Sequence, residues 1–68
     1  MQYDKPIATR PFSSHPDDSY LTVVLHRNFK GEYVTHVHNS HCDGYYHGHY
    51  FGKTAEDLEK AMKDFKNR

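Results

Sequence analysis

The stretch Tyr33–Phe51, YVTHVHNSHCDGYYHGHYF, decides the fold of this chain. Two runs rich in β-branched and aromatic residues flank the turn sequence at residues 43–44, Asp-Gly, which predicts a β-hairpin. Five of the chain's seven histidines lie in this stretch, and the pattern His-x-His occurs twice, at residues 36–38 and 47–49. Because alternate side chains of a strand point the same way, each pair is expected to lie on one face of a sheet.

Two further elements flank the predicted hairpin. Residues 19–27, SYLTVVLHR, are rich in strand-forming residues, and the following Asn-Phe-Lys-Gly suits a turn that pairs Asn28 with Glu32. This register sets Val24 opposite His36. After the hairpin, Thr54 is a typical N-cap, and the residues that follow it form an apolar stripe with helical spacing. The stripe consists of Ala55, Leu58, Ala61, Met62 and Phe65.

These patterns predict an α+β fold of βββα order. A three-stranded antiparallel β-meander is expected to carry one C-terminal α-helix on one face. Residues 19–68 are predicted to be one small domain. Residues 1–18 contain all three prolines and are expected to form an extended or partly disordered arm, with residues 1–5 as a disordered tail. A short edge strand around Ile7–Thr9 is the alternative for part of this arm.

The second hairpin admits two registers, which set His36 opposite His47 or His38 opposite His49. Both registers predict the same two faces, because they differ by an even number of residues. Tyr46, Gly48 and Tyr50 are expected to face the helix, with the glycine allowing its close approach. The opposite face is expected to stay uncovered and to carry five histidines among valine and aromatic residues. These histidines are His26, His36, His38, His47 and His49, with His26 exposed near the end of its strand.

The composition of the histidine face favours a binding function. Surfaces rich in aromatic residues and poor in lysine and glutamate are typical of protein interfaces. We therefore predict a small, non-catalytic binding or regulatory module that engages a protein partner, or a second copy of itself. Chains of this size are often accessory proteins of bacteria or their phages. The partner-binding residues are expected to be Val34, His36, His38, Tyr45, His47, His49 and Phe51.

A transition-metal site is the alternative prediction for the same face. Imidazole suits zinc, nickel or copper, and two His-x-His pairs on adjacent strands offer four ligands. The predicted ligands are His36, His38, His47 and His49. However, no carboxylate lies on that face to orient the rings, and imidazoles on a flat sheet diverge. The first prediction, of a binding module without a cofactor, is therefore favoured over a zinc protein.

Charge and composition argue against several other classes of protein. Nine basic residues balance nine acidic ones, so nucleic-acid binding is not expected. The sequence His41-Cys42-Asp43 places three reactive groups side by side in a turn, where neighbours usually point apart, so catalysis is not expected. A single cysteine excludes an internal disulfide, and no apolar run approaches the length of a membrane span. A cytoplasmic location is therefore expected.

Overall fold

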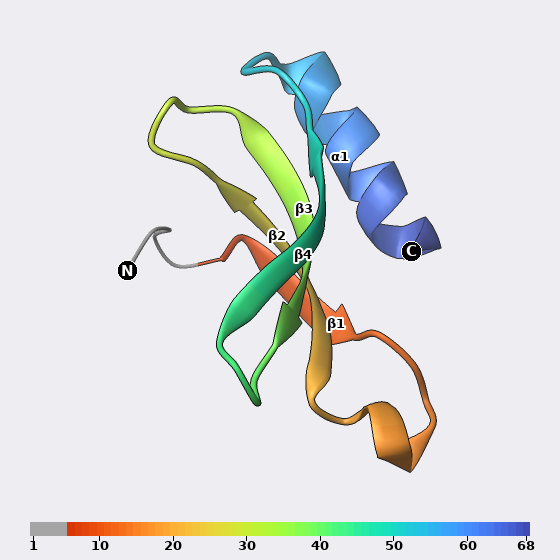
Figure 1. Cartoon of the computed structure of the whole chain (residues 1–68). Coiled ribbons are helices and arrows are strands. Elements are labelled where there is room, and N and C mark those ends of the chain that lie inside the picture. Colours follow the sequence, from red (N-terminus) through yellow and green to blue (C-terminus); the bar gives the residue numbers. More distant parts are fainter. Residues whose placement is uncertain (1–5) are drawn as a thin grey trace.

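The computed structural model describes residues 6–68, which form an antiparallel sheet of four strands and one long helix (Figure 1). The strands follow one another as a meander in the order β1-β2-β3-β4. Their bounds are Ala8–Pro11 for β1, Leu21–Arg27 for β2, Tyr33–Asn39 for β3 and Gly44–Tyr50 for β4. A short 3-10 turn, η1 (Pro16–Asp18), lies between β1 and β2, and the helix α1 (Ala55–Asn67) packs on β2 and β3. The predicted α+β class and terminal helix are confirmed, but the sheet has four strands and not three.

Strand β1 lies within the segment that was expected to be an extended or partly disordered arm. Arg10 pairs with Val23 of β2, and the backbone N–H of Ile7 donates to the carbonyl of Leu25 over 2.7 Å. Pro11 ends the strand at the edge of the sheet, where a missing N–H donor is tolerated. Part of the predicted arm is therefore an edge strand. The tail predicted for residues 1–5 lies outside the described residues.

The hairpin between β2 and β3 has the predicted register. The N–H of Asn28 donates to the carbonyl of Glu32 over 2.9 Å, and Val24 stands opposite His36. Gly31 has a φ of 85°, which is the left-handed conformation expected of glycine at this position of the turn. The turn sequence thus determined the pairing of the two central strands.

The register between β3 and β4 differs from both predicted ones. His49 stands opposite Thr35, and Tyr46 stands opposite Val37, with an irregularity between them. Two residues of β4 lie between Tyr46 and His49, but only one residue of β3 lies between Thr35 and Val37, so β4 contains a β-bulge at residues 47–48. His47 occupies the left-handed region there, with a φ of 55°. The extra residue reverses the facing of everything after it, so His49 faces the helix and Tyr50 faces away.

Gly48 has a different role from the predicted one. A Cβ atom at this position would lie 2.6 Å from Nε2 of His36, so the imidazole ring occupies the space of the missing side chain. The expectation that Gly48 would admit the helix is therefore wrong. The glycine admits a histidine ring of the neighbouring strand, and that close contact accompanies the bulge.

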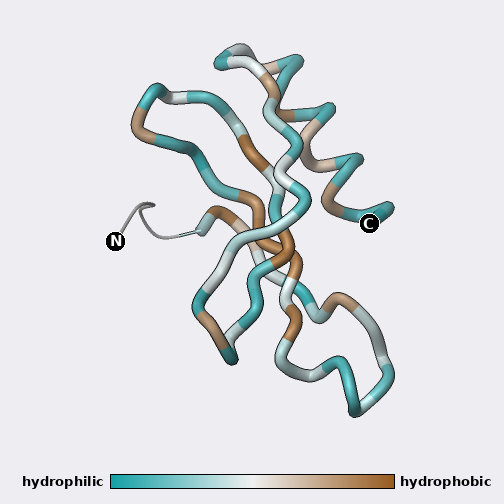
Figure 2. The backbone as a smooth tube through the Cα atoms, in the orientation of Figure 1, coloured by the Kyte–Doolittle hydropathy of each residue, from teal (hydrophilic) through white to brown (hydrophobic). Residues whose placement is uncertain are grey.

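The core lies between α1 and the two central strands. Apolar residues are concentrated along the middle of β2 and β3, as Figure 2 shows, and four consecutive residues of each strand are buried. The helix begins with a capping box, in which Thr54 and Asp57 exchange hydrogen bonds between side chain and backbone. Its buried stripe is narrower than predicted, because Ala61 is fully buried while Ala55 and Met62 are exposed. No helix within residues 6–68 is long and apolar enough to cross a membrane.

Candidate functional site

The four histidines predicted to share one face do not do so. His36 and His38 lie on the side of β3 that faces away from the helix, whereas His49 faces the helix and His47 lies in the bulge. The bulge is the physical reason, because one extra residue in β4 changes the side on which later residues emerge. Within residues 6–68, no three His, Cys, Asp or Glu side chains form a group that could hold a metal ion.

A buried pair of histidines occupies the sheet side opposite the helix. His26 and His36 are 1% and 4% exposed, and Nε2 of His26 lies 3.0 Å from Nδ1 of His36. The prediction that His26 would be exposed is therefore wrong. The rings of Tyr45 and Tyr50 pack edge-on against His36, at centroid distances of 5.4 and 5.9 Å. Tyr45 and Tyr50 of β4 thus lie over the central strands, where an open face was expected.

Burial makes this pair resistant to protonation. The loss of hydration lowers the pKa of His36 to about 4, with further lowering by the nearby charges of His26, Arg68 and His49. Burial also lowers the pKa of His26. Both rings are therefore neutral near neutral pH, and one ring nitrogen can donate while the other accepts.

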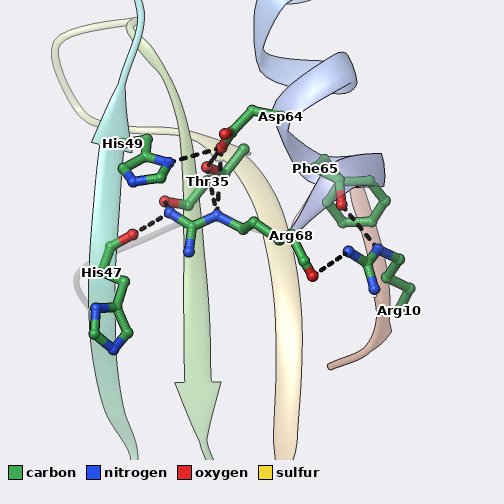
Figure 3. Close-up of polar contacts among 7 residues, drawn as sticks. All are labelled: Arg10, Thr35, His47, His49, Asp64, Phe65 and Arg68. Carbon is green, nitrogen blue, oxygen red and sulfur yellow. Dashed lines mark hydrogen bonds and ion pairs between the residues drawn. The ribbon is translucent and has the colours of Figure 1, made fainter. Parts of the chain in front are cut away.

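A second polar cluster, which we call the Asp64 cluster, joins the helix to the opposite side of the sheet (Figure 3). Oδ2 of Asp64 accepts hydrogen bonds from Oγ1 of Thr35 at 2.5 Å, from Nδ1 of His49 at 2.9 Å and from Nε of Arg68 at 3.3 Å. Burial alone would raise the pKa of Asp64, but the bonds from Thr35 and His49 and the charge of Arg68 outweigh it and lower the pKa. The carboxylate is therefore ionised and holds α1 against β3 and β4.

Two arginines complete the attachment of the helix, as Figure 3 shows. The guanidinium of Arg68 donates to the backbone carbonyl of His47, which ties the bulge of β4 to the end of the helix. Arg10 of β1 donates from Nε to the carbonyl of Phe65 over 2.8 Å and from Nη2 to that of Arg68 over 3.1 Å. The last carbonyls of a helix have no partner within it, so Arg10 supplies the donors that they need.

The outer strand β4 carries most of the exposed aromatic surface. Tyr45, Tyr46 and Tyr50 are 37%, 45% and 60% exposed, and His47 between them is exposed as well. We call these four residues the β4 surface. The strand has no Lys, Arg, Asp, Glu or Pro, and α1 packs mainly on β2 and β3. The turn before the strand is ordered by bonds from His38 to Asp43, at 2.8 Å, and between the Cys42 thiol and the Tyr46 hydroxyl, at 3.0 Å.

The structure distributes the predicted partner-binding residues over several environments. Val34 and His36 are buried, and His38 is half-buried. Phe51 is half-buried and lines a shallow depression beside α1, together with Lys60, Lys63, Asp64 and Asn67. The exposed members of the predicted set are Tyr45, His47 and His49.

Two exposed tyrosines, Tyr46 and Tyr50, were predicted to face the helix and were therefore missed. Tyr50 lies on the other side of the sheet because of the bulge, and Tyr46 is exposed because α1 does not reach across β4. The signal for the bulge was the glycine inside a strand at position 48, since such glycines often mark an irregular register or a close approach.

Comparison of the chain with protein-family models, with curated proteins and with solved structures finds no match. The buried histidine pair lies between strands, and the Asp64 cluster lies between the sheet and the helix. Each of these two polar clusters fixes β4 from one side of the sheet. The β4 surface is what these contacts present to the solvent.

Proposed function

We propose that this protein is a small, non-catalytic binding module that engages a protein partner through the β4 surface. The observation that carries the proposal is the exposure of three tyrosines along an uncharged outer strand. Tyrosine offers a large contact area at a small cost in side-chain entropy, and it is enriched where proteins bind one another. The proposed site thus keeps the tyrosine and histidine character of the predicted face but is centred on one strand.

The edge position of β4 supports this proposal. Proteins usually protect an edge strand with lysine, proline or a covering element, because its unpaired backbone groups attract other strands. The opposite edge follows this rule: β1 has four residues, ends in Pro11 and carries Arg10. Strand β4 has seven residues and neither lysine nor proline. An unprotected, aromatic edge is expected where a partner covers it.

The attachment of β4 to the rest of the fold also supports binding. Arg68 holds the carbonyl of His47, Asp64 holds His49, and the ring of His36 packs into the space above Gly48. These contacts fix the strand from both sides of the sheet before any partner arrives. A surface that is ordered in advance loses less entropy on binding.

Site-specific cross-linking tests the proposed surface. A photoreactive phenylalanine analogue is placed at Tyr46 in one version of the full chain and at Phe29 in another, and each is irradiated in extract of the native host. Phe29 is the matched control, because it is an aromatic residue that is 82% exposed in the turn between β2 and β3. We expect a discrete cross-linked protein, a second copy included, from position 46 and not from position 29.

The same product should disappear when Tyr50 is also replaced by lysine, because both residues lie on the outer strand β4 that the partner is proposed to contact, although their side chains emerge on opposite sides of the sheet. Equal cross-linking at both positions would show nonspecific contact. Absence of any product at position 46 would contradict a binding role for this surface.

A further inference from the structure

We infer that the partner of the β4 surface is the same strand of a second copy of this chain, paired antiparallel across a twofold axis. This inference rests on the proposed function and names its partner. It predicts a dimer in which two four-stranded sheets join into one continuous sheet.

The outer edge of β4 offers hydrogen-bonding groups that the rest of the described fold leaves to the outside. The N–H of Phe51 donates inward to the carbonyl of Tyr33 over 2.8 Å. Because successive N–H groups of a strand point in opposite directions, the N–H of Tyr50 points to the open edge. A row of such outward groups is complemented best by another strand, so the geometry favours a strand as the partner.

The composition of the strand favours its own copy. Self-pairing brings identical side chains together, and like charges facing one another across two strands are destabilising. The sequence of β4, GYYHGHY, contains no acidic residue, lysine or arginine, so two copies meet without this repulsion between such groups. Tyrosine beside tyrosine or histidine is also a favourable cross-strand combination.

The other edge of the sheet favours a closed dimer over a fibre. If β4 paired with β1 of the next copy, the contact would be head to tail and could continue without end. Strand β1 has only four residues, and Pro11 has no N–H donor to offer. Arg10 of the same strand is engaged with the end of the helix. In a contact of β4 with β4, both copies use the longer edge strand, which has no proline. Such a contact is complete with two copies, so no further copy can be added.

The bulge limits the strength of this contact. At residues 47–48 the strand bends and twists, which interrupts the regular spacing of outward backbone groups. The paired run is therefore short, and short interfaces of small area bind weakly and reversibly. We expect a dimer that forms in the micromolar to millimolar range of protein concentration.

Sedimentation equilibrium of the full chain over that range tests the inference. The wild type should shift from monomer towards dimer as the concentration rises. Tyr50→Lys should remain monomeric, because it sets two positive charges beside the paired strands, whereas Phe29→Lys should dimerise like the wild type. Tyr46→Lys is the second test variant, because Tyr50 touches His36 and its replacement could disturb the fold. Circular dichroism checks that each variant is folded.

Hydrogen exchange adds a direct measure of strand pairing. The amide of Tyr50 should exchange more slowly as the protein concentration rises, and amides in the turn around Phe29 should not change. A wild type that stays monomeric at millimolar concentration overturns the inference, as does a dimer that survives both lysine substitutions in β4. In either case the proposed function stands if position 46 still cross-links to a different protein, and it fails too if that product is absent.

Discussion

Lowering the pH from 7 to 5 is expected to reduce the free energy of unfolding by about 2 kcal/mol through His36 alone. In the folded protein the pKa of this ring is about 4, because the ring is buried and lies near other positive charges. In the unfolded chain it has the ordinary value of 6.5. Below pH 6.5 the unfolded chain therefore binds a proton that the folded protein does not bind.

The sign and the size of this effect follow from proton linkage. The contribution of His36 to the free energy of unfolding is fully present above pH 6.5 and falls as the pH drops. It stops falling near pH 4, where the folded ring also becomes protonated. The difference of about 2.5 pKa units corresponds to about 3 kcal/mol over the whole window, at 1.36 kcal/mol per unit. His26 contributes in the same direction, because burial lowers its pKa too. Domains of this size are stable by only about 3–10 kcal/mol, so the expected loss is a large fraction.

Urea unfolding followed by circular dichroism at several pH values between 7 and 5 measures the effect. NMR titration of the His36 ring signals gives the folded pKa directly. His36→Phe keeps a ring but removes the titrating group, so its stability should fall less over this range, although it loses the bond to His26 at every pH. His41→Gln is the control, because His41 is exposed in the turn before β4. A wild-type stability that is constant from pH 7 to 5, or a full slope in His36→Phe, would refute the reasoning.

Three further substitutions test single contacts, each by urea unfolding. Gly48→Ala should destabilise the fold by roughly 1–3 kcal/mol, since the new Cβ would lie 2.6 Å from the His36 ring, and unchanged stability would show that the ring can move aside. Arg10→Ala should cost roughly 1–3 kcal/mol and speed hydrogen exchange in the last helical turn, where Phe65 loses its partner; Arg10→Lys should not restore both bonds. Thr54→Ala should cost about 1 kcal/mol through the lost cap, while Thr54→Ser, which keeps the hydroxyl, should stay near the wild type.

The elements that rest on local signals were predictable from the sequence. The turn from Asn28 to Glu32 determined the pairing of β2 with β3, and Thr54 marked the start of the helix. In both cases the residues that specify the structure are those that form it, so no distant contact needs to be known. The α+β class followed from these two elements.

The features that depend on distant contacts were not predictable in the same way. Strand β1 is short and rich in proline, and its attachment relies on pairing with β2 and on Arg10 reaching the end of the helix. The bulge in β4 depends on His36 of another strand packing above Gly48 and on Arg68 binding the carbonyl of His47. A strict alternation of facing, from which the two faces were predicted, fails at one inserted residue. That single residue changed the candidate site from a histidine face to a tyrosine edge.

The bonds from Arg10 to the helix end also bear on when the protein can fold during synthesis. They join residues that are 55 and 58 positions apart, so the bonds between β1 and the helix cannot form before the last turn of the helix has been synthesised. While a ribosome still holds the residues around Phe65, the nascent chain can form its central hairpin but not the hydrogen bonds from Arg10 to the end of the helix. Contacts of such long sequence separation form late and slow the folding of small domains. The native fold is therefore expected to close only after residue 68 has left the ribosome.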